Sequence, residues 1–81
     1  MNQLNQKTIY TYKLFRVKDQ DGRSTTVSVD PILVAAAAKA LGDTSTVGRL
    51  IRESSLRYDK AKEGCSRSRF VQRQLLLRIQ Q

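Results

Sequence analysis

Hydrophobic and polar positions change their spacing several times along the chain, and each change predicts a new element. Residues 8–17 are rich in β-branched and aromatic side chains, which favours a strand. Residues 24–29 (STTVSV) place valines and a threonine on one side and hydroxyls on the other, the pattern of a half-buried strand. Asp21 and Gly22 lie between the two and predict a turn. The beginning of the chain is therefore expected to be extended.

Helical signals start directly after these strands. Asp30 is a favoured N-cap, and Pro31 suits the first helical position because its backbone angle is preset and it has no amide hydrogen. The apolar run that follows predicts a helix over residues 31–41, with Gly42 as its C′ residue. The many alanines of this helix indicate close packing against a neighbour.

Two further helices are predicted beyond a loop over residues 43–46. The apolar face of the first consists of Val47, Leu50, Ile51, Ser54 and Tyr58. We expect this helix to fade near residues 62–64. Ser66 can cap the second, over residues 67–80. Its apolar stripe consists of Val71, Leu75 and Ile79.

Composition and charge exclude several classes of function. The 81 residues carry 15 lysines and arginines against 7 acidic residues, a net charge of +8 that is typical of nucleic-acid binders. One cysteine and no histidine exclude disulfide scaffolds, Cys–His zinc sites and histidine-based triads. We therefore expect no enzyme, no metal and no cofactor. The lone thiol, the missing leader and the short apolar runs favour a cytoplasmic protein that does not contact membranes.

The order of these elements resembles that of one DNA-binding family. An alternating strand runs directly into a capped helix, and a glycine-containing loop leads to a second amphipathic helix. The segments that carry the resemblance are residues 25–30 (TTVSVD), Gly42 with residues 44–46, and residues 50–53 (LIRE). Over residues 25–58 the chain is similar to the ribbon-helix-helix, or Arc/MetJ-type, family.

The resemblance implies a mainly α-helical fold with a short β-ribbon, assembled as an intertwined homodimer. A lone strand cannot satisfy its own backbone groups, whereas two copies can pair antiparallel about a two-fold axis. The expected dimer core is Val27, Val29, Val34, Leu41, Val47, Leu50, Ile51 and Tyr58. Three segments result: an N-terminal arm or hairpin strand (1–22), the ribbon-helix-helix domain (23–63) and a C-terminal helical extension (64–81).

The resemblance also implies where DNA would be contacted. Outward ribbon residues of this family read bases in the major groove, and here they are Ser24, Thr26 and Ser28. Arg23 at the strand start is expected to supply a longer reader. The N-terminus of the second helix would bind phosphate through its amides. The phosphate contacts expected there are Thr44, Ser45, Thr46 and Arg49, with Thr46 as the N-cap and Ser45 as the alternative.

The first predicted strand has two alternatives. If it forms a hairpin with a loop over residues 20–22, Phe15 lies opposite Val27, and Arg16 and Lys18 join the hydroxyl side. A shorter loop would instead pair Arg16 with Val27 and place charge over the core. Because a wide sheet would crowd a DNA groove, the other alternative is a basic arm that follows the DNA backbone.

The sequence thus predicts a sequence-specific double-stranded DNA-binding repressor of a bacterial or mobile genetic element such as a plasmid, associated with the nucleoid. The alternative is an antitoxin-type, partition or relaxosome accessory protein whose C-terminal segment binds a partner protein. The arginines and the apolar stripe of that segment also allow contact between dimers, which would give a tetramer.

Overall fold

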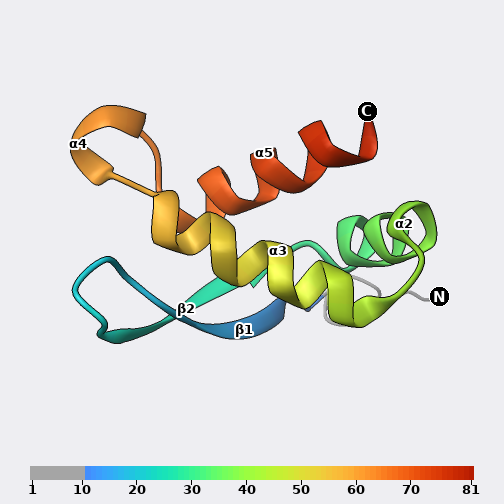
Figure 1. Cartoon of the computed structure of the whole chain (residues 1–81), viewed down its shortest axis with the longest axis horizontal. Helices are drawn as coiled ribbons and strands as arrows, with labels where there is room; N and C mark the ends of the chain where they lie inside the picture. The colour runs from blue at the N-terminus through green and yellow to red at the C-terminus, as the bar shows by residue number, and fades with distance from the viewer. Residues whose placement is uncertain (1–10) are drawn as a thin grey trace, which may run out of the picture.

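The computed structural model of the chain describes residues 11–81, which form a hairpin of two strands followed by helices (Figure 1). The strands are β1 (Lys13–Lys18) and β2 (Ser24–Val29). The helices are α2 (Pro31–Leu41), α3 (Thr44–Arg57), the short α4 (Lys60–Glu63) and α5 (Arg67–Ile79). The predicted ribbon followed by helices is confirmed. Residues 8–10 of the predicted first strand lie outside the described residues.

The hairpin has the register that the three-residue loop predicts. Phe15 lies opposite Val27 in the antiparallel pair. The Gly22 amide closes the turn by donating to the Asp19 carbonyl at 3.0 Å. Gly22 has a φ of 82°, the left-handed conformation that a bulged turn of this kind needs and that glycine reaches without strain. Residues 13–18 are therefore a hairpin strand and not an extended arm.

Asp19 stabilises the turn with its side chain. The carboxylate accepts from the amides of Asp21 at 2.8 Å and Arg23 at 2.9 Å. The bond from the Arg23 amide is the largest cause of a lowered Asp19 pKa, and the charges of Arg23 and Arg67 lower the pKa further. The carboxylate therefore stays ionised, and keeps both bonds, well into the acid range.

Two helix caps agree with the sequence prediction. The Asp30 side chain accepts from the Ile32 amide at the start of α2, and Gly42 ends this helix with a φ of 103°. The Ser66 hydroxyl accepts from the Arg69 amide at the start of α5. Local sequence therefore fixes where these two helices begin.

The predicted second helix is divided in the structure. α3 ends at Arg57 because Tyr58 adopts an extended backbone. The Tyr58 hydroxyl donates to the Cys65 carbonyl at 2.6 Å, and its ring centroid lies 5.6 Å from that of Phe70. Asp59 then caps the separate α4. Burial of the Tyr58 ring thus ends a helix that its periodicity alone would continue.

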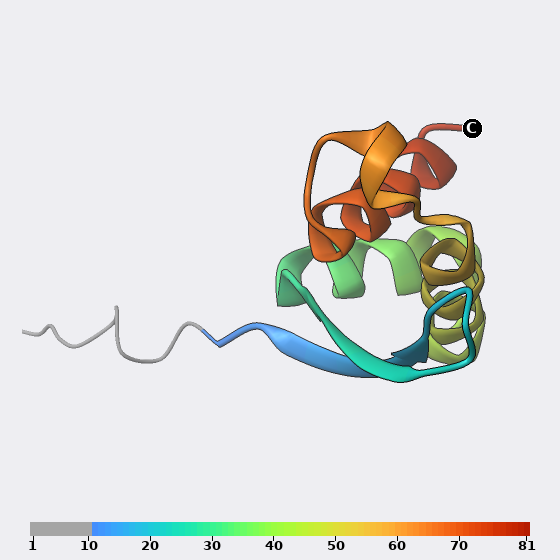
Figure 2. The same ribbon diagram turned by 90° about the vertical axis from the view of Figure 1, so that its left-hand side faces the viewer.

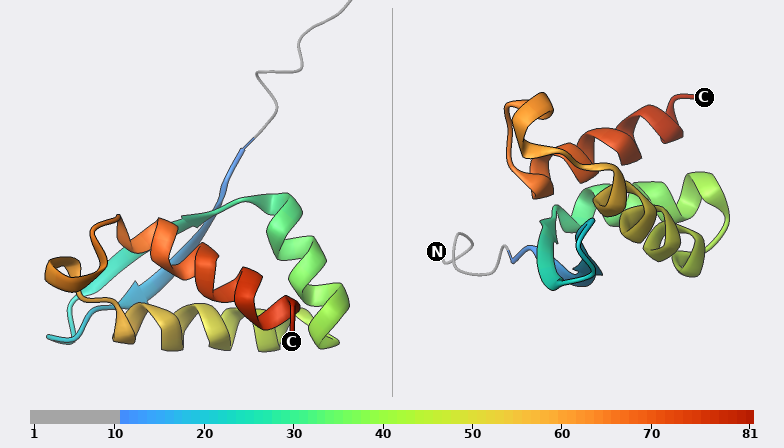
Figure 3. Two further views of the ribbon diagram at one scale, coloured as in Figure 1. Left: turned by 90° about the horizontal axis from the view of Figure 1, so that it is seen from above. Right: turned by 60° about the vertical axis from the view of Figure 1, so that its left-hand side comes forward.

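One core lies between the ribbon and the helices, which occupy the same side of the ribbon (Figure 2). Viewed from above, α5 runs between α2 and α3 and crosses the ribbon (Figure 3). The buried hydrophobic residues are Val17, Val27, Val29, Ala37, Val47, Ile51, Tyr58, Phe70, Val71 and Leu75. All the long elements therefore contribute to a single core.

The residues predicted for a dimer core pack within one chain. Five of them are buried there, whereas Val34, Leu41 and Leu50 are only partly buried at its border. The reason is that α5 and β1 bring their own apolar side chains to the same space. These side chains are Val17, Phe70, Val71 and Leu75.

A buried serine connects three elements beside this core. Ser55 of α3 is fully buried, and its hydroxyl donates to the Lys18 carbonyl at 2.9 Å. Arg67 of α5 donates to the same hydroxyl at 2.9 Å and to the Ser55 carbonyl at 2.6 Å. The Arg67 guanidinium also lies 4.7 Å from the centre of the Tyr58 ring. Ser55 therefore links β1, α3 and α5.

Ser55→Ala is expected to lower the free energy of unfolding by about 1–3 kcal/mol, because it removes the donor to the Lys18 carbonyl and the hydroxyl that accepts from Arg67. Ser54→Ala is the matched control, since Ser54 is also buried but its hydroxyl has only a 3.5 Å contact with Arg57. Urea denaturation of both variants measures the difference. Equal losses of stability would contradict the linking role of Ser55.

Candidate nucleic-acid interface

The side of the hairpin that faces away from the helices is uncovered (Figure 2). We call this surface the ribbon face, and its residues are Leu14, Arg16, Lys18, Ser24, Thr26 and Ser28. Across the strands, Lys18 pairs with Ser24 and Arg16 with Thr26. The predicted hydroxyl readers therefore share one surface with two cations from β1.

The two ends of the ribbon face carry different kinds of side chain. Near the turn it carries the exposed cations and hydroxyls. At the far end, Leu14 lies opposite the half-buried Ser28 and is 71% exposed. Such a surface offers hydrogen-bond donors and acceptors at one end and an apolar contact at the other. Base edges can form hydrogen bonds with such donors and acceptors, and a thymine methyl can pack against the apolar group.

A hollow of about 280 Å³ lies beside the ribbon face, between β1 and α3. It is lined by Arg16, Val17, Lys18, Arg52 and Leu56. Three of these side chains are cationic, so the hollow continues the positive charge of the ribbon face onto α3. Sequence reasoning missed Arg52, because only the packing of β1 against α3 brings it to the hairpin.

Arg49 extends the positive charge along α3. It lies three residues before Arg52, and side chains with this spacing are neighbours on a helix surface. Both side chains are exposed. We call Lys18, Arg49 and Arg52 the cationic strip; Lys18 also lies on the ribbon face. The spacing of Arg49 and Arg52 in the sequence was only a weak signal, since arginines three residues apart are also common on solvated helices.

Arg23 lies at the tip of the hairpin, immediately before β2, and its amide donates to the Asp19 carboxylate at 2.9 Å. The residue is exposed, and its role as a longer base reader stays a prediction.

The N-terminus of α3 is capped differently from the prediction. The cap is Asp43, and both Thr46 and Ser45 lie within the helix. The Asp43 carboxylate accepts from the Thr46 amide at 2.7 Å and from the Ser45 hydroxyl at 2.9 Å. Asp43 is the cap because it lies immediately before the helix, where an N-cap residue belongs, and its carboxylate reaches the Thr46 amide. Thr44 is exposed in the first turn.

This cap changes the electrostatics of the predicted phosphate site. The Thr46 bonds and the Ser45 bond hold the Asp43 pKa below its usual range, and the nearby charge of Arg49 lowers the pKa further. An anion arriving at the start of α3 would therefore meet an ionised carboxylate that already uses two of the donors. The geometry favours the cationic strip over the α3 N-terminus as the place for phosphate.

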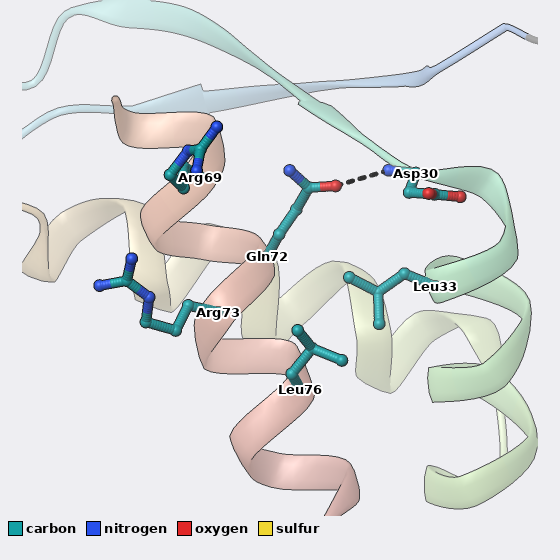
Figure 4. Close-up of a pocket in the computed structure, with 6 residues that line it drawn as sticks. All are labelled: Asp30, Leu33, Arg69, Gln72, Arg73 and Leu76. Carbon is teal, nitrogen blue, oxygen red and sulfur yellow. Dashed lines mark hydrogen bonds between the residues drawn. The ribbon is translucent and has the colours of Figure 1, made fainter. Parts of the chain in front are cut away.

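A second concave surface lies between α2 and α5, away from the ribbon face (Figure 4). This groove of about 440 Å³ is lined by Asp30, Leu33, Arg69, Gln72, Arg73 and Leu76. Within residues 11–81, no helix is long and apolar enough to cross a membrane. The same residues contain no group of three or more histidine, cysteine or acidic side chains that could hold a metal ion.

Comparisons of the chain with protein-family models, with curated proteins and with solved structures found no match.

Asp43→Asn is expected to lower stability at neutral pH, because the amide keeps a capping oxygen but loses the charge. The Asp43 pKa is lowered by folding from 3.8. Its stabilising contribution is therefore complete above that pKa and is lost as the pH falls through the lowered value. Urea midpoints of both proteins should converge in acid. A difference that stays constant with pH would contradict a charged cap.

Proposed function

We propose that this protein binds double-stranded DNA, with the ribbon face in the major groove and the cationic strip along the backbone. The observation that carries the proposal is the composition of the ribbon face. It places Arg16 and Lys18 directly across from Thr26 and Ser24 on an uncovered two-stranded surface. A two-stranded ribbon is one of the elements that the major groove admits.

The surroundings of the ribbon support this placement. All the helices lie on its other side, so they would not obstruct an approaching duplex (Figure 2). Val17, Val27 and Val29 fix the inner side of both strands in the core. The ribbon face is therefore presented on a rigid base, and the net charge of +8 would favour association with a polyanion.

The ribbon face and the cationic strip would have different tasks. Arg16 can donate two bonds to a guanine edge, and the Thr26 hydroxyl and methyl suit an adjacent base. Lys18 and Arg52 line the hollow beside the ribbon, and Arg49 lies three residues before Arg52 on α3. These cations would contact the phosphates that flank the groove. Phosphate contacts position a protein on DNA without reading its sequence, so recognition would rest on the ribbon face.

Occupancy of a DNA site by so small a protein suits repression, in which a bound protein excludes polymerase. The ribbon-helix-helix resemblance supports a regulator of a bacterial or mobile genetic element. It is also the basis for placing the protein at the nucleoid. Partition, relaxosome and antitoxin proteins use the same module, and fold alone does not distinguish these roles.

The resemblance further suggests a homodimer in which β2 of one chain pairs with β2 of another. In the single chain β2 already pairs with β1, so this dimer would use the other edge of β2. Its ribbon would then be wider than two strands. The two-stranded ribbon of the single chain already fits the major groove. We therefore favour this ribbon, rather than a wider sheet in a dimer, as the element that reads the bases.

A second candidate function is the binding of a partner protein at the α2–α5 groove. Leu33 of α2 and Leu76 of α5 give it apolar walls, and Arg69 and Arg73 line it from α5 (Figure 4). Such a surface would suit an acidic amphipathic segment. The packing of α5 in the core means that this partner would meet a formed helix rather than a flexible tail.

Lys18→Ala and Arg52→Ala are each expected to weaken binding to all duplexes alike. Each should reduce the slope of log affinity against log salt by about one, because one phosphate contact is lost. Lys62→Ala removes an equally exposed cation from α4 and is the control. Binding titrations at several salt concentrations measure the slopes. If all three variants gave the same slope, the cationic strip would not be the phosphate contact.

Thr26→Ala is expected to cost about 1–3 kcal/mol of discrimination at one base position, with little change in binding to random duplexes. Thr44→Ala, an exposed threonine at the start of α3, is the matched control and should leave base preference unchanged. Selection of bound duplexes from a random pool compares the two variants. An unchanged preference profile for Thr26→Ala would argue against readout by the ribbon face.

A further inference from the structure

The two edges of the hairpin face different helices. In an antiparallel pair the amides of successive residues point alternately toward the partner strand and away from it. The Asp19 amide donates to the Arg23 carbonyl at 3.0 Å and starts this alternation. The amides of Ser24, Thr26 and Ser28 therefore point away from β1, toward the outer edge of β2.

Two side chains of α5 hold this outer edge. The Ser68 hydroxyl accepts from the Ser28 amide at 2.9 Å. The Gln72 side-chain oxygen accepts from the Asp30 amide at 2.8 Å (Figure 4). Residues four apart on a helix lie side by side, and so do residues two apart along one edge of a strand. Ser68 and Gln72 thus match the spacing of the amides that they cover.

We propose that Ser68 and Gln72 form an edge clamp, which competes with a second copy of the chain for the outer edge of β2. While the clamp is closed, Ser28 cannot donate to another strand. When the N-terminal half of α5 releases the edge, a β2 strand from a second copy can pair there. This proposal concerns association of the chain and does not require that it binds DNA.

The pattern of β2 explains why the occupant would be a second copy. If two β2 strands pair antiparallel with Thr26 opposite itself, Ser24 lies opposite the Ser28 of the second copy. All hydroxyls then share one side of the sheet, and the valines share the other. This register uses the outward amides of Ser24, Thr26 and Ser28. The Ser28 amide is the one that Ser68 occupies.

The other edge of the hairpin is less suited to a second copy. The Lys18 carbonyl at that edge accepts from the fully buried Ser55 hydroxyl at 2.9 Å. α3 therefore holds the edge of β1 through a fully buried serine. Ser68 and Gln72 are only half-buried, so less structure has to be displaced at β2.

The test compares self-association of the double variant Ser68→Ala/Gln72→Ala with that of the native chain. Loss of both acceptors should lower the dimer dissociation constant by about tenfold, because the Ser28 amide no longer has to leave a partner in α5 before it pairs with a second β2 strand. Sedimentation equilibrium over a wide range of concentration measures it. Amide hydrogen exchange should show protection of Ser24, Thr26 and Ser28 rising together as the dimer forms.

Two controls keep the result specific. Gln74→Ala changes the same type of residue on α5 away from β2, and Ser68→Thr keeps the accepting hydroxyl, so both should associate as the native chain does. If the double variant does not fold, Ser68→Ala alone takes its place, since it frees the Ser28 amide. An unchanged dissociation constant in the folded variant would overturn the clamp. So would a native chain whose Ser28 and Asp30 amides exchange as fast as an unprotected amide. DNA binding is measured separately, and its failure would leave this result unaffected.

Discussion

The register of the hairpin decides which side chains the rest of the molecule can use. Because successive residues of a strand point to opposite sides, a slip of one residue would turn Val27 outward and Arg16 into the core. Gly22 and Asp19 set the register at the turn, through a bulge and two side-chain bonds. Ser55 sets it again at the end of β1, through its bond to the Lys18 carbonyl. Local turn chemistry and helix packing thus specify the same arrangement.

That arrangement gives the ribbon two different sides and two different edges. The inner side is buried against the helices, and the opposite side carries the charged and hydroxyl residues of the ribbon face. The two edges lie between these sides, and each faces a helix. Side chains stand perpendicular to a sheet, whereas its amides lie within it. A ligand on the ribbon face and a strand at the outer edge of β2 would therefore use different groups of the same residues.

Much of this architecture could be predicted from short-range signals. The turn at Gly22, the cap at Asp30 and the end of α2 at Gly42 each depend on neighbours in sequence, and the structure agrees with all three. The cap of α3 was predicted wrongly because several residues of one loop could serve, and only three-dimensional geometry selects Asp43. The end of α3 was missed because Tyr58 leaves the helix to pack against Phe70, a contact that periodicity does not contain.

The candidate site also has one part that local sequence predicts and one part that only tertiary packing creates. The pairing of Arg16 with Thr26 follows from the register and was expected for one loop length, whereas Arg52 reaches the hairpin only through tertiary packing. No local pattern could indicate that Ser68 and Gln72 would meet the edge of β2. Each bond joins residues about forty positions apart in the chain.

The role of α5 also explains how so short a chain can bury its ribbon without a second molecule. Phe70, Val71 and Leu75 belong to the same buried core as Val27. Contacts within a chain do not depend on protein concentration, whereas contacts between chains do. If the edge clamp of Ser68 and Gln72 competes with a second β2 strand, as we propose, dilution would favour the closed chain, and a high protein concentration would favour pairing at the outer edge of β2.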